Sequence, residues 1–246
     1  MVIAFGCSPK CPGSIPGVRF KLINMKEAYL TIDDAPSNYF KEKIDFLVAN
    51  KIPAIIFCRG ELCEKNIKAA GYAIEKGFIL GNHSYTHPHF SELTIEQARE
   101  QIVKTDKIIE SAYKMAGVKR QMKLFRFPYG DKGGELKEKI QDILKESGYK
   151  QPVFKKLNNL YSKHKKDRDL DVLWTIDIED WKLNPDSRLP LSYEEVISNL
   201  DSNISFDDKN STEIVLIHDH NETTEYFYKI ISYLKDKKKI KFVSTG

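Results

Sequence analysis

Short apolar segments alternate along the chain with longer segments in which apolar residues recur every three or four positions. Runs rich in branched and aromatic residues favour buried strands, and the helical spacing between them favours amphipathic helices. The strands predicted in this way are 28–34, 52–57, 78–82, 123–127, 172–176, 213–217 and 240–243.

Several predicted helices have recognisable ends. Thr94 with Gln97, and Ser192 with Glu195, match the capping box that begins a helix, and Gly77 is a C-terminal stop after a helix predicted over residues 61–76. Strands that alternate with helices through short connections are parallel and joined by right-handed crossovers. We therefore expect an α/β fold, a distorted (β/α) barrel of about seven or eight parallel strands.

At 246 residues the chain is long enough for one large domain with a full core. We expect an irregular N-terminal segment over residues 1–27 and one domain over residues 28–246. Residues 150–168 are rich in lysine and poor in apolar side chains. We interpret them as an insertion that enters the next strand from its N-terminal side.

Composition excludes several classes of protein. Hydrophobic residues make up 41% and charged residues 30% of the chain, as in ordinary globular proteins, and no apolar run is long enough for a transmembrane helix. The net charge of +4 is small, and the basic residues do not gather in one helix with aromatics, so nucleic-acid binding is not indicated. The apolar start, Met1 to Phe5, is too short for a secretory signal and lacks a basic leader.

The cysteines form two local pairs, Cys7 with Cys11 and Cys58 with Cys63, neither at zinc-finger spacing. Local disulfides remain open, but so few cysteines favour free thiols.

Polar clusters follow the apolar strands, and the first of them contains two adjacent acids, Asp33 and Asp34. Neighbouring residues of an extended chain point to opposite sides, so the two acids share a site only if the backbone turns, which Pro36 favours. Two acids at a strand end are also typical of a solvated turn. In a barrel, however, the C-terminal strand ends form one rim, where catalytic side chains lie.

His83 and His87 follow the third predicted strand. Four residues apart, they could face the same way over one turn and bind a metal ion through imidazole nitrogens. A lone His-x-x-x-His pair is a weak signal, but one carboxylate from another strand end would complete a ligand set. The second acid would then be free for proton transfer.

In their order along the chain, these clusters resemble the five motifs of the NodB-type polysaccharide deacetylases, carbohydrate esterase family four. The resemblance runs from about Ala28 to the C-terminus, and five motifs in the family's order argue against a chance match. The matching segments are Thr31-Ile32-Asp33-Asp34-Ala35-Pro36, His83-Ser84-x-x-His87, Arg126-x-Pro128-Tyr129, Asp177-x-x-Asp180-Trp181 and Leu216-x-His218.

The resemblance implies a role for each motif residue. Asp34, His83 and His87 would bind a divalent metal, usually zinc, although cobalt, nickel or another divalent ion would also suit such ligands. The remaining motif residues would act on the substrate: Asp33 as general base held by Arg126, His218 as general acid oriented by Asp180, Tyr129 as a backbone donor to the oxyanion, and Trp181 with Leu216 as the pocket for the acetyl methyl group.

The first motif departs from the family pattern at two positions. Ile32 replaces the usual Phe, and Ala35 replaces the usual Gly. If the backbone at Ala35 requires positive φ, its Cβ costs about 1 kcal/mol. Asp177 is interpreted as structural, and three histidines outside the motifs are interpreted as surface or supporting residues: His89, His164 and His220.

The function implied by the resemblance is metal-dependent hydrolysis of N-acetyl groups from an N-acetylglucosamine-containing polysaccharide, peptidoglycan or chitin-like, at the cell envelope or outside the cell. Two alternatives remain open: a related C–N hydrolase acting on a small amide, and a catalytically silent glycan- or metal-binding protein. The silent alternative is disfavoured because Asp33 and His218 are not needed merely to hold a metal.

Overall fold

The computed structural model describes residues 25–157 and 169–245. Predictions that concern residues 1–24, Cys7 and Cys11 among them, and the prediction for His164 fall outside the described residues. None of the helices within the described residues is long and apolar enough to cross a membrane.

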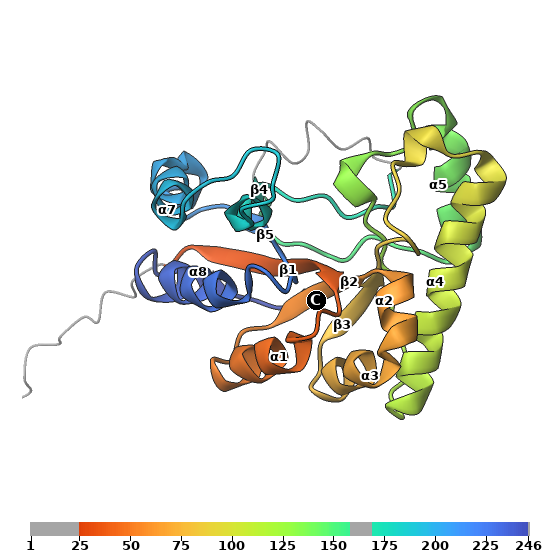
Figure 1. Cartoon of the computed structure of the whole chain (residues 1–246), viewed down its shortest axis with the longest axis horizontal. Coiled ribbons are helices and arrows are strands. Elements are labelled where there is room, and N and C mark those ends of the chain that lie inside the picture. Colours follow the sequence, from red (N-terminus) through yellow and green to blue (C-terminus); the bar gives the residue numbers. More distant parts are fainter. Residues whose placement is uncertain (1–24, 158–168, 246) are drawn as a thin grey trace, which may run out of the picture.

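The centre of the fold is a sheet in which every named strand pairing among the described residues is parallel. Its order is β3-β2-β1-β5-β4, and β6 pairs with the beginning of β1. The α/β class with parallel strands is thus confirmed (Figure 1). The strands are β1 Glu27–Ala35, β2 Ala54–Cys58, β3 Ile79–Asn82, β4 Ile176–Asp177, β5 Thr212–His218 and β6 Lys241–Phe242.

Single bridges close this sheet into a distorted barrel. Asn82 at the end of β3 bridges Phe125, and Phe125 bridges Asp171. The segment that begins at Asp171 runs into β4, which pairs with β5, so the pairings return to β1. The regular strand predicted at 123–127 is therefore wrong in detail: Pro128 has no N–H to extend a ladder, and only isolated bridges form there.

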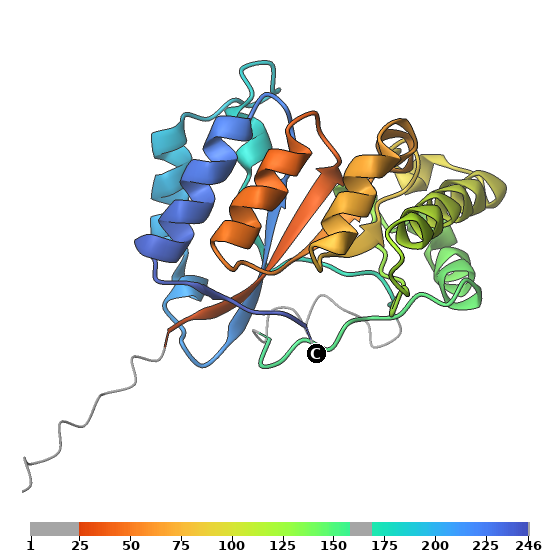
Figure 2. The ribbon, with the colours of Figure 1, turned by 90° about the horizontal axis from the view of Figure 1, so that it is seen from below.

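Helices cover the outside of the strands. Figure 2 shows α8, α1 and α3 side by side over one face of the sheet, and Figure 1 shows α4 beside α2, α3 and α5. Both predicted capping boxes are present, at the starts of α4 and α7. The helices are α1 Phe40–Ala49, α2 Gly60–Lys65, α3 Ile67–Glu75, α4 Ile95–Met115, α5 Lys137–Glu146, α7 Tyr193–Ser202 and α8 Thr224–Asp236.

The helix predicted over residues 61–76 is two helices. Asn66 interrupts it with φ −137° and ψ 58°, and the Asn66 side chain accepts a hydrogen bond from the N–H of Ala69 at the start of α3. Asparagine competes for the backbone in this way, so it favours a helix start over a helix interior.

Alternation along β1 and β5 decides which side chains reach the barrel interior. Leu30 and Ile32 on β1 join the core under the helices, as do Val215 and Ile217 on β5. Side chains at the intervening positions point to the other face. The interior set consists of Tyr29, Thr31 and Asp33 on β1, and Ile214, Leu216 and His218 on β5.

The register of this strand pair brings two motif residues together. Asp33 and His218 are Cα partners at the C-terminal ends of β1 and β5. The described part of the predicted insertion lies toward the other end, where Leu157 bridges Thr212 and the Lys155 N–H donates to the Tyr29 hydroxyl. Its first residues therefore lie away from the rim, as expected.

Candidate active site

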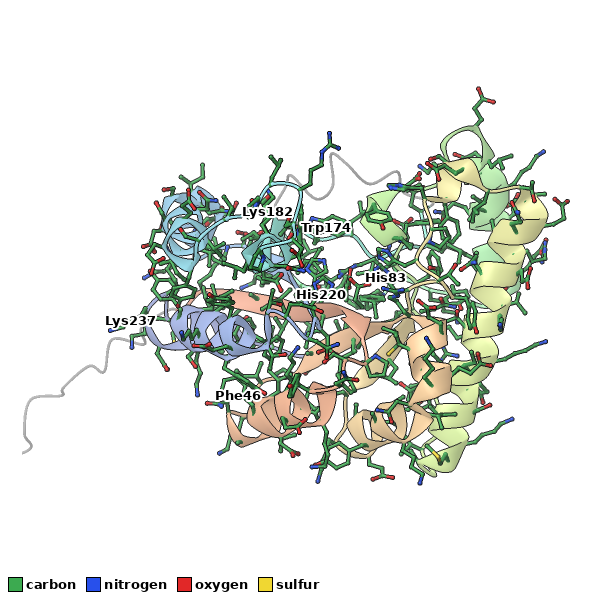
Figure 3. The ribbon with its side chains drawn as sticks, in the orientation of Figure 1. Phe46, His83, Trp174, Lys182, His220 and Lys237 are labelled. Carbon is green, nitrogen blue, oxygen red and sulfur yellow. The ribbon has the colours of Figure 1, made fainter. Side chains whose placement is uncertain are left out.

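The C-terminal strand ends surround a pocket of about 460 Å³. Figure 3 shows three of its lining side chains, His83, Trp174 and His220, gathered near the middle of the molecule. The lining residues are Asp33, Asp34, Arg59, His83, His87, Tyr129, Trp174, Asp177, Trp181, Leu216, His218 and His220.

A backbone turn brings both acids of the first motif to this pocket. Asp34 has a φ of 65°, and the pairing of β1 with β2 shifts its register between Ile32 and Ala35. The two adjacent carboxylates therefore both line the pocket. Positive φ falls on Asp34 and not on Ala35, so the backbone cost considered for Ala35 does not arise.

Asp34, His83 and His87 form a cluster that could hold a metal ion, with ligand atoms within 4.8 Å of one another. The Asp34 Oδ1 atom lies 3.4 Å from His87 Nε2 and 4.0 Å from His83 Nε2, and the two Nε2 atoms are 3.2 Å apart. Oδ1 is buried and has no hydrogen-bond partner among the described residues. A buried carboxylate oxygen without a donor fits a cation well.

The two histidines meet through an irregular loop. They face one site, as expected, but the turn that connects them is irregular, since Ser84 and His87 both have positive φ, 65° and 62°. The Ser84 hydroxyl accepts a hydrogen bond from the His87 N–H at 3.1 Å and supports the turn. The loop nevertheless brings both imidazoles to the same side of the pocket.

Hydrogen bonding prepares His83 as a ligand. Its Nδ1 lies 2.8 Å from the carbonyl oxygen of Arg126, which can only accept, so Nδ1 carries the proton and Nε2 presents a lone pair to the cluster. Burial lowers the pKa of His87 to about 4, against the opposing attraction of Asp34. His87 is therefore neutral at pH 7, as a metal ligand must be.

His220 has no role in the sequence motifs, yet it contacts Asp34 directly. Its Nε2 donates to Asp34 Oδ2 at 2.9 Å. Burial alone would raise the pKa of Asp34, but the His220 hydrogen bond and the nearby imidazoles hold it well below its usual range. One oxygen of the carboxylate is thus fixed and the other faces the cluster. The alternation of His218 with His220, two residues apart, is the sequence signal for this contact.

Arg126 is completely buried and fixes Asp33. Its Nη1 donates to Asp33 Oδ1 and to the Thr31 hydroxyl, each at 2.8 Å, and its Nε donates to the carbonyl of Val172. The second Asp33 oxygen lies 3.5 Å from His83 Nε2. Asp33 therefore presents a free oxygen toward the cluster.

Asp180 holds His218. One carboxylate oxygen accepts from His218 Nδ1 at 2.9 Å, and both oxygens lie within 3.2 Å of the His218 backbone nitrogen. Burial lowers the pKa of His218, but the buried Asp180 carboxylate outweighs it and, with Asp34 and Asp33, raises the pKa to about 10. The imidazole is consequently protonated at neutral pH, as a proton donor requires.

The remaining predicted site residues also line the pocket: Tyr129, Trp181 and Leu216. Tyr129 has a φ of 56° and is 60% exposed, and its ring stacks on His89 at 4.0 Å between centroids.

Trp174 and Arg59 were not expected in the pocket, and Asp177, interpreted as structural, lines it as well. Burial raises the pKa of Asp177.

Comparisons with known proteins agree with the family resemblance of the sequence motifs. A family model described as polysaccharide deacetylase matches residues 23–152. The chain is 35% identical over 109 residues to a peptidoglycan-N-acetylglucosamine deacetylase of Bacillus cereus, an alignment that covers 44% of this chain and 38% of that protein. The chain spans between 38% and 58% of the length of the first curated relatives it matches.

Solved structures share the fold. A family 4 carbohydrate esterase from Streptomyces lividans, in complex with acetate, has a TM-score of 0.61 at 23% identity and covers 89% of this chain and 91% of its own. A family 4 pseudoenzyme from Bacillus anthracis has a TM-score of 0.62 at 23% identity and covers 89% and 64%. The same architecture thus occurs in an esterase and in a pseudoenzyme.

Proposed function

The chain belongs to the polysaccharide deacetylase family, and from this premise we propose that it hydrolyses N-acetyl groups of N-acetylglucosamine units in a glycan, peptidoglycan or chitin-like, with the help of a divalent metal. The Bacillus cereus relative is named for this reaction on peptidoglycan, which supports the choice of substrate.

One observation carries the proposal. Asp34, His83 and His87 meet in a pocket that also holds an acid fixed by Arg126, Asp33, and a protonated imidazole, His218. A metal site alone would need neither of the last two groups. Their presence supports catalysis over simple binding.

The three ligands fit a catalytic metal. Two imidazoles and one carboxylate leave further coordination positions for water and substrate, and they suit zinc, with cobalt or nickel as alternatives. When bound, such a cation polarises the acetyl carbonyl and makes a water molecule easier to deprotonate.

The protein's own groups then carry the proton transfers. Asp33 takes the proton of the attacking water through its free oxygen, while the hydrogen bond from Arg126 holds the carboxylate in place. The backbone N–H of Tyr129 stabilises the negative charge that develops on the acetyl oxygen. His218 gives its proton to the sugar nitrogen as the C–N bond breaks, which yields acetate and a free amine.

The acetyl methyl group needs an apolar contact. Trp181 and Leu216 line the pocket together with His218, and Leu216 lies on the interior face of β5. Burial of one methyl group against such side chains contributes about 1 kcal/mol to binding.

Acetate release tests the proposal. We expect the purified protein with added zinc to release acetate from peptidoglycan or chitooligosaccharides, and Asp33→Asn to lower kcat roughly 10²–10⁴-fold while still binding zinc. Acetate from small amides alone would instead favour the small-amide hydrolase. Glycan binding without acetate release from any substrate would favour the silent binding protein.

A further inference from the structure

The pocket is lined by more carboxylates than lysine or arginine side chains. Among the described residues that line it, Asp33, Asp34 and Asp177 are acids, and Arg59 is the only lysine or arginine. Asp33 is already paired with Arg126, which lies behind the pocket wall, and Asp34 with His220. Arg59 is therefore not needed to neutralise either of the two motif acids.

Arg59 has unused hydrogen-bonding capacity. Its Nη2 forms an ion pair with Glu61, but its Nε is buried and has no hydrogen-bond partner within residues 25–157 and 169–245. A buried donor left without an acceptor costs about 1–3 kcal/mol. The side chain remains 27% exposed, so a ligand that enters the pocket can reach it.

The backbone holds Arg59 close to the reacting centre. Its N–H donates to the carbonyl of Ala35, next to Asp34, and the N–H of Gly60 donates to Ser84, next to His83. Gly60 cannot be replaced without movement, because an added Cβ would lie 2.3 Å from the Thr105 hydroxyl. Arg59 is thus anchored between the two segments that carry the metal ligands.

We propose that Arg59 binds a carboxylate on the glycan beside the reacting N-acetyl group, so that the enzyme prefers acidic N-acetylated glycans to neutral chitin-like ones. The inference rests on the proposed deacetylase function. A guanidinium offers a planar fork of donors that matches a carboxylate. In peptidoglycan strands without stem peptide this carboxylate is the lactyl acid of N-acetylmuramic acid, which lies on every second sugar.

Three tetrasaccharides test the inference: a peptide-free peptidoglycan tetrasaccharide with free lactyl carboxylates, the same compound with these converted to methylamides, and chitotetraose. For the wild-type protein with zinc, we expect kcat/KM for acetate release to be at least about tenfold higher on the free acid than on the other two, as for a lost charged hydrogen bond. Mass spectrometry of the product shows whether the muramic residue or its neighbour loses the acetyl group, and so whether the bound carboxylate lies on the reacting sugar or on the adjacent one.

Variants assign the preference to Arg59. Arg59→Gln is expected to lower kcat/KM on the free acid roughly 10–100-fold and to change kcat/KM on chitotetraose less than about threefold. Arg59→Lys keeps the charge and should retain part of the preference. Arg99→Gln, which removes an exposed arginine paired with Glu146, is the matched control and should change neither rate.

Equal rates of the wild-type protein on the acid and the methylamide would overturn the inference, and this comparison needs no variant to fold. So would a preference that survives Arg59→Gln. Both results leave acetate release, and hence the proposed function, intact. Absence of acetate from all three compounds and from whole peptidoglycan would refute both.

Discussion

The proton that leaves with the product amine resides on His218, and Asp180 determines how firmly it is held. The carboxylate of Asp180 is buried, accepts from His218 Nδ1 and raises the pKa of His218 to about 10 against the effect of burial. In Asp180→Asn, the pKa of His218 should fall. The alkaline limb of the pH profile of kcat should therefore move to lower pH, which steady-state rates between pH 6 and 10 would measure.

The same pair links stability to pH. The pKa of folded His218 lies above its unfolded value of about 6.5, so the contribution of His218 to stability is complete below that pH and is lost as pH rises toward 10. Urea unfolding of the wild type and Asp180→Asn should give stabilities that converge over this window.

For the pH profile of kcat, an unchanged alkaline limb in Asp180→Asn would show that another group is the proton donor.

His220 fixes the metal-facing carboxylate through its bond to Asp34 Oδ2. We expect His220→Ala to weaken zinc affinity roughly 10–100-fold, as for other residues that orient metal ligands. His220→Gln keeps an N–H donor and should restore part of the affinity. Competition between the protein and a zinc-binding dye measures this without reference to activity. Equal affinities in all three proteins would mean that Asp34 needs no such support.

A buried ion pair joins helix α1 to the loop after β5. Lys43 Nζ lies 2.6 Å from Asp219 Oδ1 and donates to the carbonyl of His220, while Asp219 also accepts from the N–H and hydroxyl of Ser37. The network joins the loops that follow β1 and β5, and these two strands carry Asp33 and His218. The network therefore helps to hold Asp33 and His218 in their relative positions.

Lys43→Met should lower the free energy of unfolding by about 3–5 kcal/mol, because it leaves the Asp219 carboxylate buried without its partner. Lys41, two residues earlier on α1, forms an exposed ion pair with Asp45, and Lys41→Met should change stability little. Chemical denaturation of both variants measures the difference. Similar losses would indicate that helix α1, and not the buried pair, responds to the change.

Elements with a strong local signal were predictable from the sequence. The buried runs of β1 and β5 and the capping box of α4 lie where the sequence places them. Residues 123–127 do not form the predicted regular strand. Their pairing depends on neighbouring segments that only the fold brings close, and these segments pair with them through single bridges. The break at Asn66 is likewise a side-chain contact that helical periodicity does not contain.

At the scale of the whole molecule, the ends of parallel strands could be predicted to share a rim, and the ten residues expected at the site divide between the pocket lining and its immediate support. Arg59 follows the C-terminal end of β2 directly but belongs to no motif, and Trp174 was predicted only as part of a buried strand, so neither was expected at the site. A pattern of residue types also could not predict the positive φ values at Asp34 and His87, since neither residue is a glycine.

In the proposed reaction, deacetylation depends on a divalent cation held by Asp34, His83 and His87. The most direct measurement is the metal content of protein purified without added ions, taken with acetate release before and after chelation, for the wild type and for a His83→Ala, His87→Ala double variant. We expect about one divalent ion per wild-type chain, activity lost to chelator and restored by zinc, and neither metal nor activity in the variant. Acetate release that survives chelation, or that the variant retains, would refute the metal's role.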